Sequence, residues 1–313
     1  MKQAIVFLNM GAPRDPNEVK LFLTNMFNDP NIITVKSKLL RKTIATFITT
    51  TRSKEAKSNY EKLGGVSPLV ANTADLISDV KNLYPNHEVV NIMRYTPDFA
   101  KDVITDLIAK GVDEVVLFPL YPHYSTTTVK SSLEDFYTEA KKQDFTPAIK
   151  EIKPYFQNLL YNKAVVQTIK NALDKDRAFD FHLIFSAHSL PQKIVDRGDS
   201  YQKEVIEHTD ILQQMLYDEG LNFREFHLAY QSKLGPVKWL EPSLDQKLKE
   251  FKDKSVIIVP LSFSLDNSET DFELSIEYEE EAKEIGIKSY KVAKCPNNSK
   301  KMLEFIKRQI DVK

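Results

Sequence analysis

The sequence is poor in the residues that build disulfides and metal clusters. Its 313 residues include one cysteine, Cys295, which excludes an internal disulfide and a four-cysteine iron–sulfur cluster within one chain. The formal net charge of -1 gives no electrostatic basis for binding nucleic acid. What is left is an ordinary globular composition, 42% hydrophobic and 28% charged, in a chain long enough for two domains.

Long apolar segments are missing as well. No apolar run approaches the roughly 18 residues of a membrane-spanning helix. The short run Ala4–Leu8, which follows Met1-Lys2-Gln3, lacks the length and flanks of a signal peptide. We therefore expect a reducing, cytoplasmic setting. These features are compatible with peripheral contact at the inner face of the cell membrane.

Several common catalytic signatures are absent. The sequence has neither the GxSxG turn of a hydrolase nor a Walker A phosphate loop. It also has no HExxH or CxxC cluster for zinc. The pair Gly64-Gly65 lacks the third glycine and the strand–helix context of a dinucleotide site. A hydrolase, a nucleotide-binding protein and a structural-zinc protein are therefore disfavoured.

The sequence does contain a regular alternation of strand-like and helix-like segments. Apolar runs begin at residues 3, 87, 114 and 148, and again at 181, 226, 255 and 289, with helical patterns between most of them. Such alternation predicts a mostly parallel sheet with helices on both faces. We expect two similar α/β halves, residues 1–153 and 154–297, with the last helix, 298–313, packing back on the first half.

Unusual polar clusters follow the ends of the predicted strands. They are Asn9-Met10, Arg94-Tyr95, 121–128, His188, 230–233 and 263–269. Ligands of open α/β sheets bind beyond the carboxyl ends of the strands. The convergence of these clusters predicts one cleft between the two halves.

Two of the six histidines, His123 and His188, follow strand ends. His188 comes after Ser186 and Ala187, small residues that leave room for a ligand, and its imidazole can accept a proton near neutral pH or coordinate a metal. The other four lie within or beside strands or in a polar helix, and we interpret them as structural or exposed: His87, His182, His208 and His227.

Three glutamates recur every four residues in the helix predicted over 269–285. Glu269, Glu273 and Glu277 then lie along one stripe that drifts about 40° per step. If the stripe faces a cleft, desolvation and mutual repulsion should raise the pKa of at least one carboxyl. Such a row could pass protons or hold a cation, with Glu269 as acid–base partner of His188. The alternative is a solvated acidic face that favours the helix N-terminus.

Residues 33–51 form a basic, amphipathic stretch. It places apolar residues such as Leu39, Leu40 and Phe47 among lysines and arginines such as Lys38 and Lys42. One interpretation is a helix that packs its apolar side on the protein's own core. The other is a lid or lip that touches lipid or a large apolar ligand.

Taken together, these segments resemble the ferrochelatases, which insert ferrous iron into a porphyrin to make haem. The matching segments run almost from end to end: Leu8–Gly11, YEKLGGVSP (60–68), Arg94-Tyr95, Tyr121–Ser125, FSAHSLP (185–191), YQSKLGPVKWL (230–240) and Asp266–Tyr278. The resemblance implies two Rossmann-like halves, and protoporphyrin IX and Fe(2+) as substrates in the last step of haem synthesis. It also implies no permanently bound cofactor, and we expect a monomer or weak dimer.

The resemblance also assigns roles to residues. His188 and Glu269 would be catalytic, and both would bind metal together with Glu273 and Glu277. Asp266 and Asn267 would orient the acidic row. The expected porphyrin-binding residues, with Arg52 and Ser67 near the propionates, are Met10, Arg52, Tyr60, Ser67, Arg94, Tyr124 and Trp239.

At two points the sequence departs from better-known members. Many of them carry Asp-His where this chain has Asp266-Asn267, and asparagine cannot relay protons. The chain ends at Lys313 without the cysteine-bearing extension that binds a [2Fe–2S] cluster in animal members, so we expect no iron–sulfur cluster. Two alternatives remain: a chelatase for coproporphyrin or sirohydrochlorin, and a non-catalytic haem or metal carrier. The FSAHSLP and YQSKLGP motifs favour haem synthesis.

Overall fold

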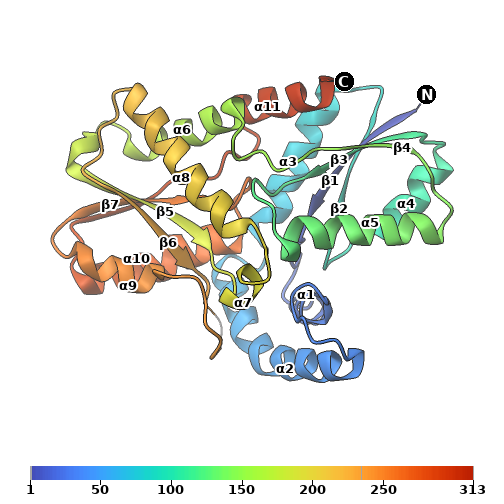
Figure 1. The fold of residues 1–313 in the computed structure, drawn as a ribbon, viewed down its shortest axis with the longest axis horizontal. Coiled ribbons are helices and arrows are strands. Elements are labelled where there is room, and N and C mark those ends of the chain that lie inside the picture. Colours follow the sequence, from blue (N-terminus) through green and yellow to red (C-terminus); the bar gives the residue numbers. More distant parts are fainter. Residues whose placement is uncertain (1, 234, 313) are drawn as a thin grey trace. The chain divides into compact units, whose positions relative to one another are not determined.

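The computed structural model describes residues 2–233 and 235–312, which form two compact units. The first comprises the residues up to 121, 125–154 and those from 306 on; the second comprises 122–124 and 155–305. Each unit contains a four-stranded parallel sheet flanked by helices (Figure 1). The predicted α/β class with two similar halves is therefore confirmed.

The first sheet has the order β2-β1-β3-β4. Its strands and the helices around it are β1 (Gln3–Asn9), α1 (Val19–Asn28), α2 (Lys38–Lys62), α3 (Pro68–Leu83), β2 (Glu88–Met93), α4 (Ala100–Ala109), β3 (Glu114–Pro119), η1 (Thr126–Lys130), α5 (Ser131–Lys142) and β4 (Ala148–Glu151). One face packs Val6 and Leu8 against Ile104 of α4 and Phe136 of α5. Residues on both faces of β1 are fully buried, as expected for a strand covered on both sides.

The second sheet has the equivalent order β6-β5-β7-β8. Its elements are α6 (Leu159–Leu173), η2 (Ala178–Asp180), β5 (Phe181–His188), α7 (Gln192–Val195), α8 (Tyr201–Asp218), β6 (Phe226–Gln231), α9 (Leu244–Leu248), η3 (Lys249–Phe251), β7 (Ser255–Pro260), η4 (Glu269–Glu277), α10 (Tyr278–Ile285), β8 (Ser289–Val292) and α11 (Lys300–Asp311). The residues of α11 from 306 on group with the first unit.

Helices cover both faces of this second sheet. Leu244 and Phe251 pack with Ile184 and Val256 on one face, where α9 and α10 lie, and α6 and α8 lie on the other (Figure 1). After β5 the chain forms β6 on one side of that strand and then crosses over to form β7 on its other side. In such sheets the point where the strand order reverses is where ligands bind. That point is the carboxyl end of β5, at His188.

Two helices differ from their predicted form. The segment after β7 is π-helical over Glu269–Glu277 and becomes α-helical only from Tyr278, whereas periodicity predicted one α-helix over 269–285. The segment Thr126–Lys130, which overlaps the predicted polar cluster 121–128, is π-helical as well. A four-residue repeat falls slightly beyond one α-helical turn and slightly short of one π-helical turn, so spacing does not separate the two.

The helix α2 covers only part of the predicted stretch 33–51: it begins at Lys38 and continues past residue 51 to Lys62. Its apolar side chains are divided between core and solvent: Ala45 is buried, whereas Leu39 is 78% exposed and Phe47 is 70% exposed. Within residues 2–233 and 235–312, no helix is long and apolar enough to cross a membrane.

Candidate active site

His188 is the last residue of β5 and pairs in register with Gln231, the last residue of β6. Its backbone is fixed on both sides: its N–H donates to Ser262 Oγ at 3.2 Å, and its carbonyl accepts from the Tyr201 hydroxyl at 2.8 Å. The Tyr201 and Ser262 hydroxyl oxygens lie 2.5 Å apart. These contacts hold the position of His188 without using its imidazole.

The imidazole of His188 is left available. Its ring lies edge-on to Phe263, with 6.2 Å between the ring centres. Among the described residues, its buried Nδ1 has no hydrogen-bond partner. Burial lowers the pKa of His188, and the charge of Glu269 acts in the opposite direction. The side chain is therefore neutral near pH 7, the form that accepts a proton or binds a metal.

Glu273 is a hydrogen-bonded carboxyl of the acidic row with a raised pKa. It accepts hydrogen bonds from Gln231 Nε2 at 3.1 Å and from the Ser232 hydroxyl. Burial raises the pKa of Glu273 to about 7 and the charge of Glu269 adds to the rise, although the bonds from Ser232 and Gln231 oppose it. The expectation that at least one carboxyl has a raised pKa is confirmed here. A group that titrates near 7 can take up and release a proton under physiological conditions.

The end of β6 positions this carboxyl. The Gln231 amide is fully buried, accepts from Ser186 Oγ at 2.6 Å and donates to Glu273. Ser232 has φ 67°, in the left-handed region that residues other than glycine seldom adopt. Such strained residues persist where the surroundings hold them, often at functional sites. The hydroxyl of Ser232, the residue with this left-handed backbone conformation, donates to the Glu273 carboxylate.

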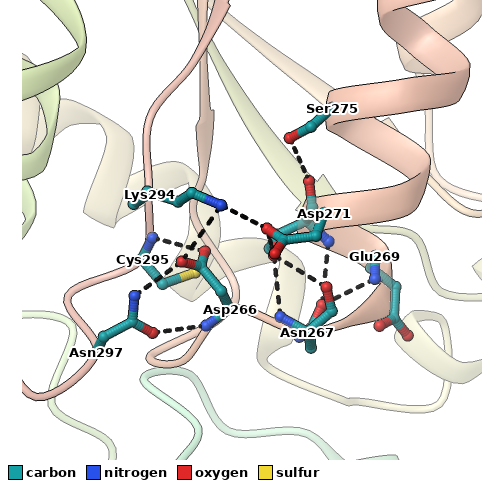
Figure 2. A network of polar contacts seen from close by, with 9 residues as sticks. Asp266, Asn267, Glu269, Asp271, Ser275, Lys294, Cys295 and Asn297 are labelled. Carbon is teal, nitrogen blue, oxygen red and sulfur yellow. Dashed lines mark hydrogen bonds and ion pairs between the residues drawn. The ribbon is translucent and has the colours of Figure 1, made fainter. Parts of the chain in front are cut away.

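Asn267 stands at the start of η4 and caps it. Its Oδ1 accepts from the backbone N–H groups of Glu269 at 2.9 Å and Thr270 at 3.1 Å (Figure 2). These bonds satisfy donors that the first turn of a helix leaves without partners. Asn267 thus bonds to the backbone of Glu269, and Thr270 Oγ1 in turn accepts from the Asn267 N–H at 2.9 Å.

Asp266 faces a different segment. Its carboxylate accepts from the Cys295 N–H at 2.9 Å and from Asn297 Nδ2 at 2.8 Å (Figure 2). Lys294 Nζ lies 3.9 Å from this carboxylate and 2.7 Å from that of Asp271. These bonds fasten the chain that follows β8 to the start of η4. Asp266 therefore supports the site by holding this loop. Its carboxylate bonds are to the loop and not to the glutamates of the acidic row.

The row of glutamates runs from half-buried to exposed. Glu269 and Glu273 are half-buried, whereas Glu277 is exposed. The interpretation of a solvated acidic face fits Glu277 but not Glu273, whose carboxylate is hydrogen-bonded and desolvated.

The expected porphyrin-binding residues of the first unit have different surroundings. Met10 and Tyr60 belong to the same apolar cluster, and Arg52 is half-buried. Ser67 is buried and accepts from the Leu69 N–H at 3.3 Å as the N-cap of α3. The guanidinium of Arg94 is also bonded within the protein.

Arg94 belongs to a network of carboxylates. Its guanidinium lies 3.2 Å from Asp29 and 3.4 Å from Asp135, and its Nε donates to Ser131 Oγ at 2.9 Å. The Asp29 side chain is fully buried, so it needs a cation nearby. A propionate would therefore have to compete with two carboxylates for Arg94.

Tyr124 and Trp239 lie in the second unit, as His188 does. The Tyr124 N–H donates to the Glu204 carboxylate at 2.7 Å. Trp239 forms an isolated antiparallel bridge with Pro191, three residues after His188. Both side chains are half-buried and can offer ring surface to a ligand.

His123, the other histidine after a strand end, is part of the core. Its Nε2 lies 3.0 Å from Nδ1 of His208, whose Nε2 lies 2.9 Å from Asn162 Oδ1. Burial lowers the pKa of His123 to about 3. Sequence reasoning also missed Gln231 and Ser232; the signal available was their place in YQSKLGP, directly after a strand.

Comparisons with known proteins identify the family of this chain. A family model described as Ferrochelatase matches residues 2–312. The chain is 54% identical over 304 residues to the ferrochelatase of a Nitratiruptor species, with 97% of each chain covered. It is 50% identical over 306 residues to the ferrochelatase of Sulfurimonas denitrificans, again covering 97% of each.

The fold has relatives among solved structures. SirB from Bacillus subtilis with Fe3+ superposes with a TM-score of 0.61 at 14% identity, covering 99% of this chain and 94% of that one. At this identity the likeness concerns the fold. The family model and the relatives, by contrast, extend over nearly the whole sequence, so the chain belongs to the ferrochelatase family, the enzymes that insert ferrous iron into a porphyrin.

Proposed function

We propose that this chain inserts Fe(2+) into protoporphyrin IX to form protohaem, and that His188, Glu269 and Glu273 handle the protons and the metal. The assignment rests on a neutral imidazole, at His188, and a carboxyl that titrates near 7, at Glu273, which accepts from Gln231, the register partner of His188. His188 Nδ1 has no described hydrogen-bond partner, and the pKa of Glu273 is raised to about 7.

The reaction defines what these groups must do. A free-base porphyrin carries two pyrrole protons, and both leave as one divalent ion enters the ring. His188 accepts a pyrrole proton at its imidazole, and Glu269, whose charge acts on that imidazole, favours the protonated form. Glu273 passes this proton on to solvent, because its pKa lies close to the working pH. The same route then takes the second pyrrole proton. The exposed Glu277 is the outermost carboxyl of the row.

The same groups suit ferrous iron as a substrate. Imidazole and carboxylate are both ligands that Fe(2+) accepts. A metal at His188 and Glu269 would also favour deprotonation of the neighbouring carboxyl, since an opposite charge favours the ionised form. Arrival of iron and departure of protons are therefore coupled through electrostatics.

For the macrocycle, we assign apolar and aromatic surface to Met10, Tyr124 and Trp239, and a propionate contact to Arg52. The polar groups of Ser67 and Arg94 are already bonded within the protein, so we assign these two residues a supporting role in porphyrin binding. A ring held bent exposes its nitrogen lone pairs, and such distortion is worth roughly 1–5 kcal/mol drawn from binding at the ring edges.

The exposed side of α2 gives the basis for a peripheral membrane contact. Leu39, Leu40 and Phe47 are exposed, and Lys38 and Lys42 on the same helix are exposed too. This combination suits the interface of an anionic bilayer, from which a poorly soluble porphyrin would be collected. We assign this role to residues 33–51.

A spectrophotometric assay tests the activity. Purified protein is mixed with Fe(2+) and porphyrin in excess over protein, under reducing conditions, and metalloporphyrin formation is followed. We expect multiple turnovers with protoporphyrin IX. A signal that stops at one equivalent would identify a carrier, and faster turnover of coproporphyrin or sirohydrochlorin would reassign the substrate.

A further inference from the structure

We propose a second metal site, formed by His182, Glu225 and His227 at the edge of the second sheet opposite the candidate active site, and suited to tetrahedral zinc. His182 is the second residue of β5, His227 is the second residue of β6, and Glu225 directly precedes β6. The parallel pairing of β5 and β6 brings the starts of both strands together.

This cluster is far from the metal-handling residues described above. His182 and His188 lie six residues apart in the same strand, which corresponds to about 20 Å at the rise of a parallel strand. The inference is therefore independent of iron insertion.

The distances among the three donor atoms carry the argument. Glu225 Oε2 lies 3.3 Å from His182 Nδ1 and 3.4 Å from His227 Nε2, and the two nitrogens lie 3.4 Å apart. Donors at 2.0–2.1 Å from a tetrahedral zinc ion are separated by about 3.3–3.4 Å, the edge of the tetrahedron. An octahedral ion with the same bond lengths would draw neighbouring donors to about 2.9 Å.

Direct hydrogen bonding explains this spacing less well. Hydrogen bonds from ring nitrogens are usually about 2.7–3.2 Å long, and all three separations exceed that range. The three atoms thus stand nearly equidistant, each slightly too far from the others for a good bond and at the spacing of a shared ion.

The imidazoles are held in place and in the right protonation state. Phe251 packs edge-on against both rings, with 5.0 Å between centres in each case. Burial lowers the pKa of both His182 and His227, so both are neutral near pH 7, as metal ligation requires. The Glu225 side chain is 62% exposed, which leaves a path for the ion and a fourth position for water.

The charges around the cluster are mixed. Lys254 and Arg224 act on His182, and Lys247 acts on His227, each disfavouring added positive charge. Glu250 acts in the opposite direction and pairs with Lys247 at 2.8 Å. With two neutral imidazoles and one carboxylate, a zinc-loaded site has a net charge of +1. The ion pair between Lys247 and Glu250 reduces the repulsion between Lys247 and this charge.

Calorimetric titration with Zn²⁺ of the full chain carrying His188→Ala tests the proposal, because that background removes a ligand of the candidate active site. We expect one equivalent of zinc to bind, and Glu225→Gln added to this background to weaken that binding at least tenfold. Glu225 is exposed, so this change spares the fold. Glu55 is exposed on α2, in the other unit, so Glu55→Gln is the matched control and should keep the binding.

Two further readouts constrain the result. Co²⁺ in place of zinc should show the intense visible absorption of a four-coordinate ion, lost in the Glu225→Gln variant. In the otherwise wild-type chain, Glu225→Gln should lower zinc stoichiometry by one equivalent and leave metal insertion unchanged. Equal zinc affinity with and without the Glu225 carboxylate, or no zinc binding in the His188→Ala background, would overturn the site.

Discussion

At the scale of single residues, the site depends on side chains that are left free while their backbones are fixed. His188 is the clearest case: its N–H and carbonyl are hydrogen-bonded, whereas its Nδ1 has no partner among the described residues. Removing the ring therefore leaves no orphaned group behind, and the fold should tolerate the loss.

His188→Ala should accordingly retain native circular dichroism and lose turnover by about 10²–10⁴-fold, the usual contribution of a positioned acid–base group. Metalloporphyrin formation under saturating substrate measures the effect. His87→Asn is the matched control, because His87 bonds to Gln3 in the other unit, and it should keep normal turnover. A His188→Ala enzyme as fast as wild type would remove this residue from the mechanism.

The acidic row should show a gradient of effects. Glu269 acts electrostatically on His188 and is half-buried, whereas Glu277 is exposed. Glu269→Gln should therefore lower turnover by at least tenfold and Glu277→Gln by less than threefold, each barrier change following about 1.4 kcal/mol per factor of ten. Initial rates of the two variants decide the point; equal, small losses would favour a solvated acidic face.

At the scale of elements, the π-helical segment η4 determines where Glu269 and Glu273 lie. Asn267 caps its first turn through two backbone N–H groups, and Asp266 ties its start to the loop after β8. A wider helical turn changes the direction of side chains four residues apart relative to an α-helix.

The cap should matter for stability more than for chemistry. Asn267→Ala should lower stability by about 1 kcal/mol, the usual cost of losing an N-cap, and lower turnover at most about tenfold. Thermal unfolding and the insertion assay measure both. Asn267→Asp keeps the accepting oxygen and is the control. A loss of several orders of magnitude in Asn267→Ala, with porphyrin binding intact, would give this amide a direct catalytic role.

The exposed face of α2 predicts weak binding to anionic vesicles. Flotation should recover part of the wild-type protein with the vesicles, and replacing Leu39, Leu40 and Phe47 together with serine should abolish this. Phe179 is 65% exposed in the second unit, so Phe179→Ser controls for loss of exposed apolar surface in general. Retained flotation in the triple variant would contradict the assignment.

At the scale of the whole molecule, the architecture and the position of His188 could be predicted from sequence. Strand–helix alternation implies parallel sheets, and parallel sheets gather the residues after strand ends. Both the architecture and the position of His188 follow from local sequence patterns, because each strand is recognisable by itself.

The rest depended on contacts between residues distant in the sequence. Arg94 stays a predicted porphyrin-binding residue, but the sequence does not show that Asp29 and Asp135 contact its guanidinium. His182 and His227 were interpreted as structural or exposed, because nothing in a linear pattern shows that two strand starts will bring them together. Likewise, periodicity could not distinguish the π-helical turn of η4 from an α-helix.

The central claim is that Glu273 exchanges protons during metal insertion because its pKa is raised to about 7. To accept a proton it must be ionised, so kcat/KM should rise with pH through about 7 in the wild-type enzyme. The lowered pKa of His188 keeps that group neutral over the same range.

The pH dependence of kcat/KM for wild type and Glu273→Gln tests this most directly. We expect kcat/KM of the wild type to rise with pH near pH 7. We expect kcat/KM of the variant to be lower and constant across this range. Superimposable profiles with equal rates would contradict it.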